Sequence, residues 1–144
     1  MLIFTINTIP KPQRQTRFYS RGGHLHGYDP SKKDLQFIQW QLKPYAPAIP
    51  FTGPIIADYT FYMPIPRSAS KVKARQMSAH IIKHIIRPDL DNLAYLVTNA
   101  MKGIIYRDDS QIVEKHERKM YGVEPRIVIK IFELNAIEGL DDRK

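Results

Sequence analysis

A chain of 144 residues with a hydrophobic fraction of 43% has room for one compact domain and one core. It contains no cysteine, which excludes disulfides and thiolate zinc sites and is compatible with a reducing cytoplasm, and no apolar run is long enough to cross a bilayer. Lys and Arg number 22 against 14 acids, so the formal net charge of +8 favours a polyanion such as nucleic acid or anionic lipid as the partner.

Hydrophobic periodicity predicts a mixed order of strands and helices. Helices are expected between Ser31 and Pro44, over residues 70–79, and between Pro88 and Gly103. Residues 10–28 are expected to form a loop rich in Pro, Gly and Arg. Strand patterns occupy residues 2–9, 54–63, 111–120 and 126–134.

This order predicts a single α/β domain over residues 1–137. Its architecture is expected to be an α+β mixed sheet of about four strands with two main helices. Residues 138–144 are expected to be a solvated tail.

The helix expected after Pro88 has an apolar stripe on one side. Gly103 follows at the position where a glycine commonly ends a helix. The polar side carries Asp91 and Tyr95, with Thr98 along the same side. The stripe itself consists of Leu93, Leu96, Val97, Ala100 and Met101.

Four aspartates flank this helix. If Asp89 ends an extended segment while Asp91 occupies the first helical turn, the two carboxylates can converge, and Asp108 and Asp109 return toward the same end of the sheet. Clustered carboxylates repel one another unless a cation neutralises them, and oxygen ligands in an open site suit Mg²⁺ or Mn²⁺. Such a site permits phosphodiester hydrolysis.

A purely structural interpretation stays open. Asp89 is also a normal helix N-cap, and Asp91 is a first-turn acid that the helix dipole favours. The segment Asp108-Asp109-Ser110 equally matches a simple turn.

Two basic segments are expected to hold nucleic-acid phosphates. Between the arginines of the first segment, Phe18 and Tyr19 could stack on unpaired bases or anchor the segment to the core, and we favour the anchor. Residues 64–88 hold eight Lys, Arg or His residues and no acid. The expected phosphate-binding residues are Lys11, Arg14, Arg17, Arg21, Arg67, Lys71, Lys73, Arg75, Lys83 and Arg87.

The run PDLDNLAYLVTNAMKGIIYRDDSQIV resembles the signature of RusA-type Holliday junction resolvases. The opening strand with its Pro- and Arg-rich continuation, the segment MPIP and the basic run before the acids resemble that family more weakly. The resemblance implies a RusA-like fold and a homodimeric, Mg²⁺- or Mn²⁺-dependent endodeoxyribonuclease of bacterial or phage origin. Such an enzyme resolves four-way DNA junctions by symmetric paired nicks in recombination and repair. It implies metal binding by Asp89, Asp91 and Asp109, with Asp108 as a neighbouring acid.

One departure concerns a lysine that the family usually carries one helical turn after the second aspartate, where this chain has Tyr95. A substitute cation is expected from Lys73, Lys83, His84 or Arg87, and Lys102 is less favoured because it lies about three turns along the helix from Asp91. The alternative is a non-catalytic or weakly catalytic relative that binds junction DNA. A weaker third possibility, based on charge alone, is an RNA-binding translation protein.

Overall fold

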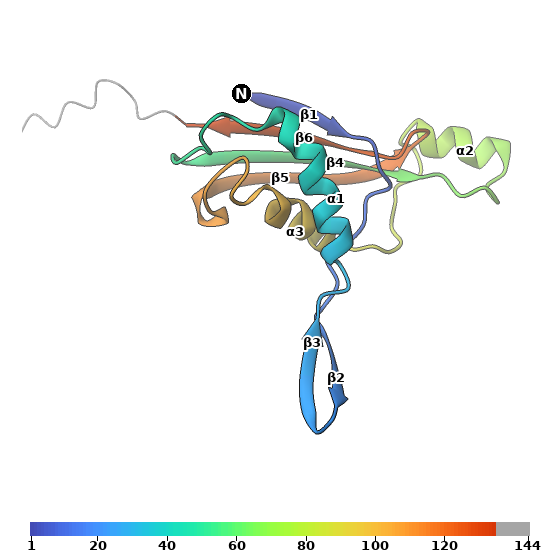
Figure 1. Ribbon diagram of the computed structural model, residues 1–144. Coiled ribbons are helices and arrows are strands. Elements are labelled where there is room, and N and C mark those ends of the chain that lie inside the picture. The colour runs from blue at the N-terminus through green and yellow to red at the C-terminus, as the bar shows by residue number, and fades with distance from the viewer. Residues whose placement is uncertain (135–144) are drawn as a thin grey trace, which may run out of the picture.

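A computed structural model describes residues 1–134, which form a single α+β domain (Figure 1). Its four-stranded sheet has the order β1 (Leu2–Ile6), β6 (Arg126–Glu133), β4 (Ile55–Pro64), β5 (Ile112–Gly122). Strand β4 is parallel to β5 and antiparallel to β6, and β6 is antiparallel to β1. The helices are α1 (Lys32–Leu42), α2 (Lys71–Ser78) and α3 (Leu90–Met101), with short 3-10 turns η1 (Lys43–Tyr45) and η2 (Asp109–Gln111).

The core lies between one face of the sheet and the helices α1 and α3. Alternate residues of β4 are buried, as expected for a strand with one covered face, and the expected apolar stripe of α3 is entirely buried. Each fully buried large apolar side chain contributes roughly 1.5–3 kcal/mol relative to leaving it exposed. The predicted mixed sheet and the two main helices are confirmed.

Polar groups inside this core fix α3 against β4. The Tyr59 hydroxyl lies 2.9 Å from the Thr98 hydroxyl, and the Tyr106 hydroxyl donates to the Thr98 carbonyl at 2.6 Å. Burial raises the pKa of both tyrosines, so both phenols stay neutral. Because the polar atoms are satisfied, the outer side of α3 is held in a defined orientation.

Residues 17–28 form a β-hairpin and not the expected loop. Strands β2 (Arg17–Arg21) and β3 (His24–Tyr28) pair antiparallel across Gly22 and Gly23, whose φ angles of 60° and 76° are those of a two-residue hairpin turn. In Figure 1 the hairpin projects away from the sheet and helices. Phe18 is 66% exposed and Tyr19 48% exposed, so the favoured prediction that they anchor this segment to the core is wrong.

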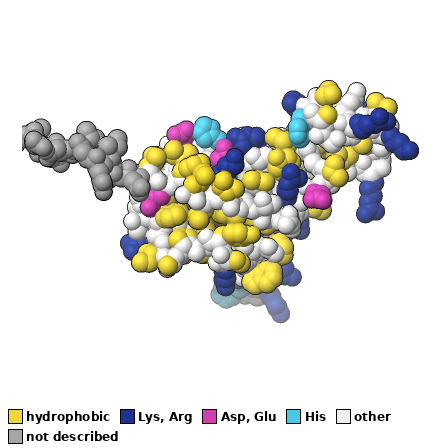
Figure 2. All heavy atoms as spheres, turned by 90° about the horizontal axis from the view of Figure 1, so that it is seen from above, with side chains coloured by type: hydrophobic (Ala, Val, Ile, Leu, Met, Phe, Trp, Pro, Cys, Tyr) yellow, Lys and Arg dark blue, Asp and Glu magenta, His cyan; other side chains and the backbone are white. Residues whose placement is uncertain are grey.

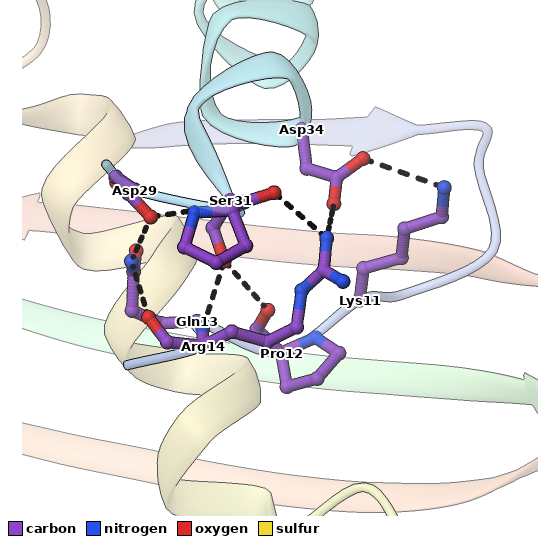
Figure 3. A network of polar contacts seen from close by, with 8 residues as sticks. Lys11, Pro12, Gln13, Arg14, Asp29, Ser31 and Asp34 are labelled. Carbon is purple, nitrogen blue, oxygen red and sulfur yellow. Dashed lines mark hydrogen bonds and ion pairs between the residues drawn. The ribbon is translucent and has the colours of Figure 1, made fainter. Parts of the chain in front are cut away.

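A hydrogen-bonded neck, residues 11–14 with 29–34, joins the hairpin to α1 (Figure 3). The Arg14 backbone N–H donates to the buried Ser31 hydroxyl at 2.8 Å, and the Arg14 guanidinium donates to the Pro30 carbonyl at 2.7 Å. Lys11 and Arg14 both pair with Asp34, at 3.3 and 3.8 Å. The base of the hairpin is therefore fixed although its strands are exposed.

Helix α2 begins at the predicted place, because the Ser70 hydroxyl accepts from the Lys73 backbone N–H. It ends at Ser78, two residues before His80, which has a left-handed φ of 62°. Trp40 is 66% exposed and does not belong to the core. No helix among residues 1–134 is long and apolar enough to span a membrane. The predicted solvated tail at residues 138–144 lies outside the described residues.

Candidate active site

The acidic motif starts where an extended segment meets α3. Asp89 has φ −67° and ψ 141°, and Asp91 lies in the first helical turn, as the sequence predicted. The Asp89 side chain makes no capping hydrogen bond, although it stands at the N-cap position. Neither carboxylate has a hydrogen bond or ion pair to another described residue. Both are therefore available to a ligand.

The segment before Asp89 is held against β5. The Lys119 ammonium donates to the carbonyls of Ile86 and Pro88 at 2.7 and 2.9 Å. The buried His84 ring packs edge-on against Tyr121, with 4.8 Å between ring centroids. Burial and the Lys119 charge lower the pKa of His84. His84 is thus neutral in the packed segment and does not supply a cation to the site.

The two aspartates of the second pair, Asp108 and Asp109, have different roles. Asp108 caps η2: its carboxylate accepts from the Ser110 backbone N–H at 3.1 Å, while the Gln111 side chain accepts from the Asp108 backbone N–H at 2.8 Å. Hydrogen bonds from Ser110 and Lys102 hold the Asp108 pKa well below its usual range. Asp108 therefore has the structural role of a turn residue, and Asp109 is left facing outward.

Asp91 and Asp109 line one pocket of about 490 Å³, together with Tyr95. Strand β5 contributes Glu114 and Glu117 to the same pocket. Asp89 instead lines the adjacent hollow. Within residues 1–134, no three His, Asp or Glu side chains are arranged closely enough to form a ready-made metal site. The structure thus brings two of the three predicted ligands together and places the third beside them.

Lys115 of β5 lines the pocket, and Lys102, directly after α3, is paired with the second pair of aspartates. The Lys102 ammonium lies 2.9 Å from Asp108 and 3.9 Å from Asp109. This pairing with Asp108 raises the pKa of Lys102, which stays protonated. Lys102 was disfavoured as the substitute cation because about three helical turns separate it from Asp91, but the chain after Gly103 folds back onto the end of α3 and brings Asp108 and Asp109 to it.

The expected phosphate-binding residues fall into two groups. Lys11 and Arg14 are engaged in the neck with Asp34. The others are exposed and have no ion-pair partner among residues 1–134, and Figure 2 shows Lys and Arg side chains gathered over the α2 end of the molecule. These exposed residues are Arg17, Arg21, Arg67, Lys71, Lys73, Arg75, Lys83 and Arg87.

The contribution of β5 to the pocket, through Glu114, Lys115 and Glu117, was not predicted from the sequence. Lys115 and Glu117 pair at 2.7 Å, and Glu114 pairs with His116 at the same distance. The signal available was the acid-rich start of the strand directly after Asp109. Its position beside α3 depends on the parallel pairing of β4 with β5, which joins segments far apart in the chain.

The chemistry of these donors fits a hard divalent cation. The pocket is open and presents the free carboxylate of Asp91 beside that of Asp109. Mg²⁺ and Mn²⁺ prefer such oxygen ligands and keep several waters, so a complete cage of protein ligands is not needed. Charge repulsion between the acids would decrease when a cation binds.

Comparison with known proteins agrees with this arrangement. The family model described as endodeoxyribonuclease RusA matches residues 8–132, which include both pairs of aspartates. The chain is also 33% identical over 137 residues to a protein of Bacillus subtilis (strain 168) named "Uncharacterized protein YqaN", covering 92% of this chain and 96% of that protein. The chain therefore belongs to the RusA endodeoxyribonuclease family.

Proposed function

We propose that this protein is a metal-dependent, structure-selective endodeoxyribonuclease that resolves four-way DNA junctions by paired nicks. Membership of the RusA family supports nuclease chemistry. The observation that carries the proposal is the shared pocket of Asp91 and Asp109, two acids 18 positions apart in sequence. Asp91 has no ion-pair partner among residues 1–134, and a basic protein that places it in one pocket with Asp109 has a site suited to a cation.

Asp91 and Asp109, with Asp89 beside them, would hold Mg²⁺ or Mn²⁺. When bound, the cation would polarise the phosphoryl oxygens and lower the pKa of a bound water. The Tyr95 hydroxyl lines the same pocket and can donate a hydrogen bond to a phosphate oxygen. Lys102 adds a fixed positive charge next to Asp109, where negative charge would develop on the phosphate.

The rest of the DNA would be held by basic side chains outside this pocket. All ten expected phosphate-binding residues are exposed, and the formal net charge of +8 favours association with a polyanion. Each phosphate contact releases counterions, so binding should weaken steeply as salt increases. The proposed assembly is a homodimer, because two-fold symmetry places two sites on two strands of a junction.

A second candidate is a family member that binds junctions without cutting them. Two observations favour it: Tyr95 provides no charge to the pocket, and Asp89 lines a separate hollow. The free carboxylates of Asp89 and Asp91 argue against it, since a site without a cation gains nothing from their repulsion.

Synthetic four-way junctions, incubated with the protein and Mg²⁺ or Mn²⁺, separate the two candidates. We expect symmetric cuts by the native protein and a loss of at least about 100-fold in rate for Asp91→Asn and Asp109→Asn, as for removal of a group that stabilises the transition state. Glu124→Gln is the matched control, because Glu124 is an exposed acid in the turn between β5 and β6. Tight binding by the native protein without any cut would establish the non-catalytic candidate.

A further inference from the structure

The β2–β3 hairpin has two chemically different faces. Cross-strand partners share a face, and successive residues alternate between faces. One face combines the pairs Arg17–Tyr28, Tyr19–His26 and Arg21–His24. The other carries Phe18, Ser20, Leu25 and Gly27. All ten strand residues are exposed to solvent, so neither face is covered within the described chain.

The first face, which we call the arginine–aromatic face, has ordered rings at its centre. The Tyr19 ring is stacked on His26 with centroids 5.2 Å apart, and it also contacts Tyr28 at 6.2 Å. Arg17 and Arg21 flank these rings and have no acidic partner among residues 1–134. Aromatic rings can stack on nucleic-acid bases, and guanidinium groups on either side of them can bind the phosphates that join those bases.

The opposite face explains how the hairpin keeps its shape. The Phe18 ring lies directly over Gly27, where an added Cβ would be only 3.0 Å from a ring carbon. That contact orders the strands but buries little area, and an isolated two-stranded hairpin is marginally stable in water. A ligand on the arginine–aromatic face would therefore add to its stability.

Charge identifies the kind of ligand. Residues 1–28 contain Lys11, Arg14, Arg17 and Arg21 and no Asp or Glu. Two acids lie at the base of this segment, and both are engaged: Asp34 is paired with the two neck cations. Asp29 accepts from the Gln13 side chain and from the Ser31 backbone N–H. Two copies of the face would repel each other, whereas a polyanion would be attracted. We propose that the arginine–aromatic face is a nucleic-acid-binding arm that stacks unpaired bases on Tyr19 and His26 and contacts their phosphates with Arg17 and Arg21.

The position of the arm relates it to the acidic pocket. Arg17 and neck residues 12–14 line the same hollow as Arg87 and Asp89. The Gln13 backbone N–H donates to the Asn92 carbonyl at 2.9 Å, which attaches the neck to the first turn of α3. A strand held by the arm would thus continue past Asp89. This inference rests on the proposed function in taking DNA as the ligand, and it adds the element that recognises unpaired bases.

The test is binding without cleavage, measured by fluorescence anisotropy in EDTA with a labelled four-way junction, a single strand and a duplex. We expect Tyr19→Ala and His26→Ala to weaken binding to the single strand and the junction by about tenfold, and binding to the duplex much less, because stacking needs an unpaired base. On the single strand, Arg17→Gln and Arg21→Gln should each reduce the slope of log affinity against log salt by about 0.7, the value for one phosphate contact on single-stranded nucleic acid.

Leu25→Ala is the matched control, since it removes an exposed apolar side chain from the opposite face and should change affinity less than about twofold. Thermal melting should be the same for all variants because the strands lie outside the core. Equal affinity of Tyr19→Ala and native protein would overturn the inference but leave the nuclease proposal standing. Conversion from dimer to monomer by Tyr19→Ala would overturn it in favour of a protein interface. A native protein that binds no DNA would overturn both.

Discussion

At the scale of single residues, the adjacent acids Asp108 and Asp109 have different roles: the first caps a turn and the second lines the acidic pocket. Asp108 is engaged by Ser110, Gln111 and Lys102, whereas Asp109 faces the pocket that it shares with Asp91. We therefore predict that Asp108→Ala lowers the melting temperature by about 2–4 °C through loss of the η2 cap and retains most of the cleavage rate. Asp109→Ala should retain the melting temperature and abolish cleavage. Calorimetry and a junction-cleavage assay on the same preparations measure both quantities.

The positive charge of Lys102 should affect how tightly the neighbouring acids bind a metal ion. Its ammonium is close to both carboxylates, so Lys102→Met should increase the affinity for Mn²⁺ by roughly twofold to fivefold, as expected when an exposed positive charge near a cation site is removed. Titration calorimetry with Mn²⁺ and no DNA measures this directly. The matched control is Lys130→Met, because Lys130 is an exposed lysine on β6 away from the pocket. Weaker Mn²⁺ binding by Lys102→Met would contradict an electrostatic role for the ammonium.

At the scale of elements, the segment between α2 and α3 depends on a neutral histidine. The pKa of His84 is lowered in the folded protein, so the unfolded chain takes up a proton first as pH falls. The stabilising contribution is fully present above about pH 6.5, the usual value for histidine, and is lost as pH falls below it toward the folded-state value. Urea unfolding at pH 7.5 and 5.5 should therefore show a larger loss of stability for the native protein than for His84→Phe, which keeps a ring against Tyr121 but cannot be protonated.

The elements also differ in how well the sequence predicts them. Strand β4 and helix α3 each bury one face, and burial of one face produces the regular spacing that pattern analysis detects. The β2–β3 hairpin buries neither face, so its sequence has no such spacing. The signal that could have identified it was Gly22-Gly23 between two aromatic segments, because paired glycines permit the positive φ angles of a tight turn.

The acidic site was predictable only within its local segments. The positions of Asp89 and Asp91 at the start of α3 followed from Pro88 and the apolar stripe. The ion pair of Lys102 with Asp108 depends on how the chain turns back after α3, and the pocket that Asp91 shares with β5 depends on how α3 packs on the sheet. Spacing along one helix gives no information on such contacts.

At the scale of the whole molecule, we predict a homodimer with twice the 16.8 kDa mass of the chain. Light scattering measures the mass. A dimer made of one native and one Asp91→Asn subunit, purified with two different tags, should nick a cruciform plasmid once and leave an open circle, whereas the native dimer should yield linear DNA. Paired cuts by a protein of monomeric mass would contradict the prediction.

The neck has a mechanical consequence for the molecule. Arg14 is hydrogen-bonded to Ser31 and Pro30 just before α1 (Figure 3). Gln13 is hydrogen-bonded to Asn92 in the first turn of α3. These hydrogen bonds connect the base of the hairpin to the backbone beside Asp91. DNA that bends the arm would shift the acids by a related amount, so the shape of the substrate and the geometry of the carboxylates would change together.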